Sequence, residues 1–133
     1  MTLVDTSVWI DFFRGLNLSH VQQLEQMLQQ GEDIALCGVI LTEILQGIRD
    51  DSSFESTRNR LKPLLLLPMT ESIFVQAAVI YRTLRAHGIT VRKPIDCMIA
   101  ATALEHGTKL LHNDHDFEMI GRHYPLRISY AQH

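Results

Sequence analysis

The sequence predicts an α/β fold: a single domain with a central, mostly parallel sheet of four to five strands flanked by helices. The chain has 133 residues, a length that suits one domain. Short apolar runs alternate along it with longer segments of helical periodicity. Because each run is apolar throughout, the strands should be buried on both faces, as in a parallel sheet covered by helices. Hydrophobic residues make up 46% and charged residues 20% of the chain, which excludes a disordered protein.

Strands are predicted wherever a short apolar run ends at a polar or turn-forming residue. The first run follows Met1 directly, and the third is ended by Pro68. A last short run near the C-terminus is a candidate fifth strand. The predicted strands cover residues 2–5, 34–37, 64–67, 109–112 and, as the fifth, 126–128.

Helices are predicted between these strands from apolar residues spaced three and four apart. Thr6 and Ser7 are good capping residues for the first helix. Ser19 and the three residues after it match a capping box, which should open the second helix. The predicted helices cover residues 8–15, 19–30, 39–48, 53–62, 70–87 and 95–106, with a shorter one inside 113–120.

Charge and cysteine content exclude several classes of protein. The net charge of −3 argues against broad electrostatic coating of nucleic acid, although it does not exclude a nuclease. Two cysteines, Cys37 and Cys97, are too few for a disulfide scaffold or a four-thiolate zinc site. No apolar run approaches the roughly 20 residues of a membrane span, and no signal peptide precedes the first strand. We therefore expect a cytoplasmic protein.

Five acidic residues stand where a parallel sheet would gather them. Asp5 ends the first strand, Asp114 and Asp116 follow the fourth, Asp96 lies in the first turn of a helix, and Glu43 lies in the helix after the second strand. Sites in open parallel sheets form outside the carboxyl ends of the strands. Each acid also has an ordinary explanation as a helix-capping, turn or solvated residue. The combination favours a shared site.

Carboxylates gathered in one pocket need protons or cations. Two like charges about 4 Å apart repel by roughly 4 kcal/mol at an effective dielectric constant near 20. Hard oxygen ligands suit magnesium or manganese rather than zinc. Such ions activate water and stabilise charge on a phosphodiester during its cleavage. The chain has no glycine-rich phosphate-binding loop, which disfavours nucleoside triphosphate chemistry.

Four segments in order resemble the PIN-domain ribonucleases, most closely the VapC-type toxins of bacterial VapBC toxin–antitoxin pairs. The segments are Val4 to Trp9, Thr42-Glu43, Asp96 to Ala101 and Asn113 to Phe117, and the match extends along nearly the whole chain. The resemblance implies a PIN domain over residues 1–133. It implies a metal-dependent endoribonuclease toxin of a type II pair, which cleaves RNA phosphodiesters through metal-activated water. A cognate VapB-type antitoxin would inhibit it, and the family tends to form homodimers.

Asp5, Glu43, Asp96 and Asp114 match the acidic quartet of the resembled family. The resemblance implies that Asp5, Asp96 and Asp114 hold one or two Mg²⁺ or Mn²⁺ ions. Glu43 would hold a metal-bound water or orient the nucleophile. The products would carry 5′-phosphate and 3′-hydroxyl ends.

Three further positions beside the quartet are implied with less defined roles. Asp116 would support the ligands from behind. Either Ser7 or Thr6 matches a hydroxyl position beside the site, and the sequence does not choose between them. His112 stands where family members often carry Thr or Ser, which puts the hydrogen bonding behind the quartet in question.

Arg92, Lys93 and Arg14 are candidates for contacts with RNA phosphates, because the first two directly precede Pro94 and Asp96. The alternatives are solvated charge or a salt bridge to an acid of the pocket. A second basic stretch, with Arg58, Arg60 and Lys62, is more typical of a solvated helix face.

Trp9, Phe12 and Phe13 crowd one short helix, so at least one of them could line a groove for a partner. In the resembled family such a groove receives the C-terminal segment of the antitoxin. A zinc site at His112 and His115 lacks the further histidines or cysteines that would complete it.

Three other functions remain as alternatives. A PIN-domain nuclease could process RNA without being a toxin, and the bare single domain favours the toxin. A PIN domain without activity could serve as a binding module, but the complete quartet argues against it. A phospho-receiver signalling domain has similar size, yet it would need paired acids after the first strand, where Thr6 and Ser7 follow Asp5.

Overall fold

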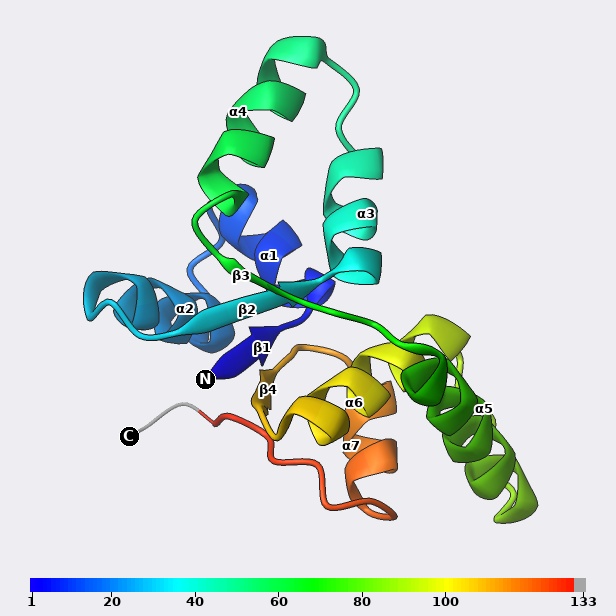
Figure 1. The fold of residues 1–133 in the computed structure, drawn as a ribbon. Helices are drawn as coiled ribbons and strands as arrows, with labels where there is room; N and C mark the ends of the chain where they lie inside the picture. Colours follow the sequence, from blue (N-terminus) through cyan, green and yellow to red (C-terminus); the bar gives the residue numbers. More distant parts are fainter. Residues whose placement is uncertain (131–133) are drawn as a thin grey trace.

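The computed structural model describes residues 1–130 and contains one sheet of four parallel strands in the order β3-β2-β1-β4. This confirms the predicted parallel α/β fold. Figure 1 shows the sheet with helices on either side of it. The strands are β1 (Thr2–Val4), β2 (Ile34–Cys37), β3 (Leu65–Leu67) and β4 (Lys109–Leu111).

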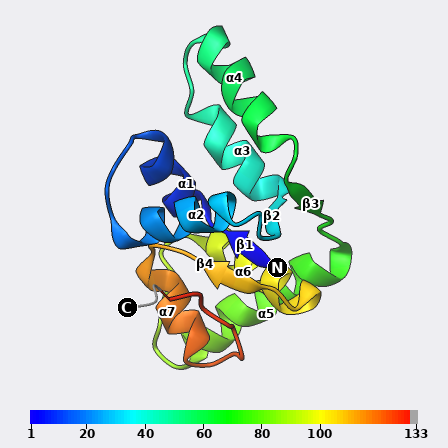
Figure 2. The same cartoon turned by 90° about the vertical axis from the view of Figure 1, so that its left-hand side faces the viewer.

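Seven helices accompany the strands in the described part of the chain. Helices α3 and α4 project from one side of the sheet, while α5, α6 and α7 gather on the opposite side (Figures 1 and 2). None of the helices within residues 1–130 has the length and apolar character needed to cross a membrane. The helices are α1 (Thr6–Phe13), α2 (Ser19–Gln29), α3 (Gly38–Gln46), α4 (Asp51–Leu61), α5 (Glu71–Ala86), α6 (Pro94–His106) and α7 (His115–Gly121).

The centre of the sheet is fully buried, which explains why the strands read as continuous apolar runs. Leu3 of β1 pairs with Ala35 on one side and with Leu110 on the other, and all three are inaccessible to solvent. Side chains on both faces of β1 are covered, so its sequence shows no alternation of polar and apolar residues. Helices packed on both faces of this sheet hold the carboxyl ends of β1, β2 and β4 at one edge.

The third strand was predicted to be buried, but most of it is exposed. Within residues 1–130, β3 lies at the edge of the sheet and pairs with β2 alone. Leu65 and Leu66 are consequently exposed, with 54% of Leu66 accessible, while Leu67 is buried. An apolar run does not distinguish an edge strand from a central one.

The predicted fifth strand at 126–128 is only an isolated bridge. The backbone of Leu110 donates a hydrogen bond to the carbonyl of Arg127 and accepts one from the N–H of Ser129. These two bonds pair Leu110 with Ile128 in parallel orientation. Because the pairing involves one residue on each side, the segment does not extend the sheet by a strand.

Two predicted helix starts also need correction. The carboxylate of Asp5, rather than a hydroxyl of Thr6 or Ser7, caps α1 by accepting from the N–H of Ser7. Helix α2 begins one residue earlier than the capping box requires, because the carbonyl of Leu18 already accepts from the N–H of Gln22. Ser19 therefore lies inside the first turn, and its side chain makes no capping bond.

Candidate active site

The four acids of the predicted quartet converge at the carboxyl edge of the sheet. Asp5 follows β1, Glu43 lies in α3 after β2, Asp114 follows β4, and Asp96 lies in the first turn of α6. Their charges influence one another: Asp5 and Asp114 both raise the pKa of Asp96 and of Glu43. The structure thus brings together residues that are up to 109 positions apart in the chain.

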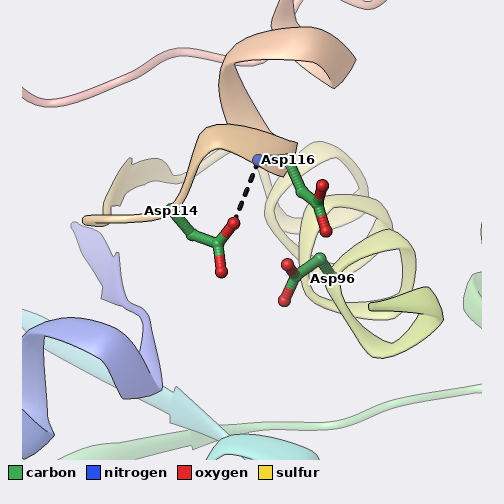
Figure 3. A group of neighbouring side chains, drawn as sticks. All are labelled: Asp96, Asp114 and Asp116. Atoms are coloured by element: carbon green, nitrogen blue, oxygen red, sulfur yellow. Dashed lines mark hydrogen bonds between the residues drawn. The ribbon is translucent and has the colours of Figure 1, made fainter. Parts of the chain in front are cut away.

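Three carboxylates form the tightest group at this edge. Asp96, Asp114 and Asp116 offer oxygen atoms that lie within 4.8 Å of one another, from the first turn of α6 and the start of α7 (Figure 3). This acid trio includes Asp116, which the sequence placed behind the ligands, and does not include Asp5. Carboxylate oxygens at this separation are a donor set that suits a hard divalent cation.

Asp116 ties two segments of the chain together. It is 3% exposed, and its two carboxylate oxygens accept the backbone N–H groups of Arg92 at 3.3 Å and Lys93 at 3.0 Å. Its own N–H donates to Oδ1 of Asp114 at 3.0 Å, the bond drawn in Figure 3. Asp116 therefore sets the relative position of the segment before α6 and the start of α7.

Asp96 carries a strongly perturbed carboxyl group. It is 2% exposed, and within the described residues its Oδ2 has no hydrogen-bond partner. Burial, together with the charges of Asp5 and Asp114, raises the pKa of Asp96 to about 8. A buried acceptor without a donor, facing two further carboxylates, is the arrangement that a bound cation would complete.

Asp5 is held by the first turn of α1, which it caps. Through Ser7 it is also linked to Asn113, beside Asp114. Its Oδ2 accepts from the N–H of Ser7 at 3.0 Å and from the hydroxyl of Ser7 at 2.6 Å. The same hydroxyl oxygen accepts the N–H of Asn113 at 3.0 Å. Burial raises the pKa of Asp5, and the bonds from Ser7 partly offset this. Ser7 thus joins β1 to the segment that carries Asp114.

Thr6 has a different partner. Its hydroxyl donates to Oε1 of Glu43 at 2.8 Å, across the junction between α1 and α3. Burial raises the pKa of Glu43, and the bond from Thr6 partly offsets the increase. The structure therefore gives each hydroxyl its own acid, Ser7 with Asp5 and Thr6 with Glu43.

The basic residues predicted near the pocket have different surroundings. The ammonium of Lys93 forms an ion pair with Oδ2 of Asp114, while the exposed Arg92 contributes a charge that helps to lower the pKa of Asp114. Arg14 lines a cavity beside Phe13 and Glu43. For Lys93, the alternative of a salt bridge to an acid of the pocket is the one observed.

The second basic stretch lies on α4 and shortly after it. Arg58 pairs with Glu55 on the same helix at 3.8 Å, and the guanidinium of Arg60 lies over the rings of Phe12 and Phe13, 5.4 and 5.1 Å from their centroids. Lys62 is exposed. Arg60 therefore connects α4 to α1 through cation–π contacts.

The side chain of His112 holds the backbone of Asp114 in place. The position of His112 in the sequence did not reveal this role. Its Nδ1 accepts the N–H of Asp114 at 3.1 Å, and its ring lies 5.0 Å from that of Phe117. Nε2 is 3.3 Å from Oε1 of Glu118 without a hydrogen bond, and burial lowers the pKa of His112. Over residues 1–130, the group suited to a metal contains no histidine, so a zinc site at His112 and His115 has no support.

Together these features define a class: an α/β protein with a parallel sheet and, at its carboxyl edge, a group of carboxylates of the kind that suits a divalent cation. The chain belongs to the PIN domain family, whose model matches residues 2–122. PIN-domain nucleases use divalent metal ions, and the acid trio provides ligands of the required kind.

Curated relatives extend over most of the chain. It is 38% identical over 124 residues to the ribonuclease VapC11 of Mycobacterium tuberculosis, covering 92% of each protein. It is also 30% identical over 118 residues to the ribonuclease VapC51 of the same species, covering 89% of this chain and 83% of VapC51.

Solved structures share the fold at lower sequence identity. A chain of the VapBC2 complex from Rickettsia felis, bound to a DNA fragment from its promoter, superimposes with a TM-score of 0.75 at 17% identity, over 96% of both chains. A chain of FitAcB from Neisseria gonorrhoeae gives a TM-score of 0.76 at 22% identity, over 98% of both chains. These likenesses show that the chain shares its fold, over nearly its whole length, with a chain of each of these two structures.

Proposed function

We propose that this protein is a metal-dependent endoribonuclease, the toxin of a type II toxin–antitoxin pair. Its membership of the PIN domain family and its identity to proteins named VapC ribonucleases support the proposal. The observation that carries it is the buried carboxyl of Asp96, whose unpartnered Oδ2 lies in the trio with Asp114 and Asp116. A site that gathers carboxylates in this way is suited to hold a cation against a phosphodiester.

Asp96 and Asp114 are the residues we expect to hold Mg²⁺ or Mn²⁺, with Asp5 or Asp116 completing the set. One or two such ions, when bound, would activate water and stabilise the negative charge that develops on the phosphodiester. Glu43, held in place by Thr6, would accept a hydrogen bond from the attacking water and so orient it. Asp116 would keep the start of α7 and the segment before α6 in register.

Positive side chains at the rim would contact the RNA. Arg92 is exposed next to the acid trio, and Arg14 lies in the cavity that reaches Glu43. With a net charge of −3, the protein depends on such local positive groups to counter the repulsion between RNA and its acids. Lys93 would reach a phosphate only after leaving Asp114.

A cognate antitoxin would bind in the cavity between α1, α3 and α4. Phe13, Ile10 and Ile44 provide apolar lining, while Glu43 provides a carboxylate. Trp9 is buried in the core, so Phe13 is the aromatic residue that lines this cavity. An extended or helical peptide segment with an arginine near its end would fill the apolar part and pair with the acids.

Association of two copies through β3 and α5 is the second protein contact that we propose. Exposed apolar side chains cluster on these two elements, and an edge strand with exposed leucines favours a covering partner. A cytoplasmic location agrees with an RNA substrate and with the two free, buried thiols. The exposed apolar side chains are Leu65, Leu66, Phe74, Val75 and Val79.

The decisive experiment is cleavage of a mixed tRNA and rRNA pool by the purified protein, freed of any antitoxin. The reaction is run with Mg²⁺, with Mn²⁺ or with chelator, beside Asp96→Asn. Asp33→Asn, an exposed aspartate before β2, is the matched control. We expect discrete products that need the metal, that persist in the control and that disappear in Asp96→Asn. Equal cleavage in excess chelator would show that the proposed mechanism is wrong.

Growth of cells that express the protein without an antitoxin tests the toxin role separately. We expect growth arrest by the wild type and none by Asp96→Asn. RNA cleavage in vitro with no effect on growth would favour a PIN-domain nuclease that processes RNA.

A further inference from the structure

Lys93 is attached to the acid trio at two points. Its backbone N–H donates to Oδ2 of Asp116 at 3.0 Å, and its ammonium pairs with Oδ2 of Asp114. It is also the residue that precedes α6, three positions before Asp96. The backbone of Lys93 is therefore fixed beside the site, while its side chain, 53% exposed, rests on one of the carboxylates.

The ammonium of Lys93 acts electrostatically on four acids at this edge of the sheet. The positive charge of Lys93 lowers the pKa of Asp5, Glu43, Asp96 and Asp114. Burial lowers the pKa of Lys93 itself, but the contact with Asp114 and the charges of Asp96 and Asp5 outweigh burial and raise it. The ammonium of Lys93, which is paired with Asp114, thus acts as the counter-ion of the site.

Both oxygens of Asp114 are engaged in this arrangement. Oδ1 accepts the N–H of Asp116 at 3.0 Å, and Oδ2 holds the ammonium of Lys93. A divalent ion bound between Asp96 and Asp114 would share the Asp114 carboxylate with this ammonium, and two cations at one carboxylate repel each other. The flexible four-carbon stem of lysine lets the ammonium leave without any change in the backbone.

We propose that Lys93 is a resident cation of the metal-free site, which holds Asp114 until a divalent ion displaces it. This inference rests on the metal site of the proposed function. It assigns Lys93 two opposite effects: the side chain stabilises the metal-free protein and weakens the binding of metal. The metal concentration at which the site fills is then higher than the carboxylates alone would set.

Lys93→Met separates these effects, because methionine keeps the apolar stem and removes the charge. Lys109→Met is the matched control: it removes the same charge from an exposed position at the start of β4, the end of the strand opposite to the site. Binding of Mn²⁺ is measured by titration calorimetry and by electron paramagnetic resonance at pH 7. Thermal unfolding is recorded in chelator and at saturating Mn²⁺.

We expect Lys93→Met to bind Mn²⁺ about two- to fivefold more tightly than the wild type, the effect of removing one partly exposed charge pair. In chelator its unfolding temperature should be lower than that of the wild type, and Mn²⁺ should raise it by more. Lys109→Met should match the wild type in both measurements. If Lys93→Met and the wild type bind Mn²⁺ with equal affinity, and if Mn²⁺ raises their unfolding temperatures equally, the role proposed for Lys93 is wrong. The metal site itself would then still stand. No binding of Mn²⁺ by any of the three proteins would remove the metal site and this proposal with it.

A measurement on the wild type decides the matter if Lys93→Met does not fold. Lysine ammonium signals are followed by nuclear magnetic resonance in chelator and during titration with Mg²⁺, with Lys93→Arg used to assign the signal. We expect the Lys93 signal to be visible in chelator and to be lost as the carboxyl carbon of Asp114 shifts. A Lys93 signal that stays unchanged while Asp114 shifts would contradict displacement.

Discussion

A carboxyl group that is buried without a partner opposes folding once it must ionise. In the folded protein Asp96 has a pKa of about 8, against an ordinary value of 3.8. Between these values the folded chain retains a proton that the unfolded chain releases. This contribution to stability is fully present below about pH 4 and is lost as the pH rises towards 8. The site therefore holds an acid that is unfavourable for stability and suited to bind a cation.

Asp96→Asn should make the metal-free protein more stable at alkaline pH, because asparagine carries no charge to bury. We expect its free energy of unfolding in chelator to exceed that of the wild type by roughly 1–3 kcal/mol at pH 8. The difference should disappear towards pH 4. Urea unfolding of both proteins between pH 4 and 8.5 measures it. A constant difference across this range would contradict the raised pKa.

At the scale of elements, the site depends on how the segment before α6 meets the start of α7. Asp116 makes this connection by accepting from the backbone of Arg92 and Lys93 and donating to Asp114. The role resembles that of a helix cap, but the residues joined are 23 and 24 positions apart. Loss of this one carboxylate would release the backbone from which Lys93 extends.

Asp116→Ala should destabilise the protein by about 2 kcal/mol, since two part-buried backbone N–H groups lose their carboxylate acceptor. Amide hydrogen exchange at Arg92 and Lys93 should accelerate, and Mn²⁺ should bind more weakly. Asp116→Asn, which keeps one acceptor oxygen, should fall between the wild type and Asp116→Ala. Unchanged exchange at both amides would show that Asp116 does not hold this segment.

Local sequence pattern predicted the elements better than their junctions. Apolar runs and helical spacing located all four strands and seven helices of residues 1–130, because these signals depend on neighbouring residues. The capping box at Ser19 was wrong, since the chain enters α2 through Leu18. A salt bridge from Lys93 to an acid of the pocket was one of the alternatives, but its partner Asp114 and the backbone bond to Asp116 could not be predicted, because they arise from the packing of α6 beside α7.

The acidic quartet, too, could be predicted only in part from the sequence. Positions after parallel strands were enough to expect Asp5 and Asp114 at one edge, because the topology of the sheet brings them there. Which carboxylates lie nearest to one another depends on side-chain direction, and the structure groups Asp116 with Asp96 and Asp114. The roles of these acids in catalysis stay predictions until the variants are measured.

At the scale of the whole molecule, the apolar surface on β3 and α5 predicts self-association. Leu66→Glu and Val75→Glu each place a charge on this surface, where the native side chains are 54% and 57% exposed. We expect sedimentation equilibrium to show a dimer for the wild type and a monomer for the double variant, with unfolding of the separated chain little changed. A monomeric wild type at micromolar concentration would contradict the proposed contact.

The order of the strands has a consequence for the time at which the site comes into being. β1 lies between β2 and β4, and Asp114 reaches Asp5 only when β4 has paired with β1. A ribosome makes Asp5 long before Asp114, and the N-terminal part of a growing chain emerges first. A nascent chain can therefore form β1, β2 and β3 while its acids are still apart. Under the proposed function, a chain under synthesis would carry no complete nuclease site, and the RNA of its own ribosome would be spared until β4 docks.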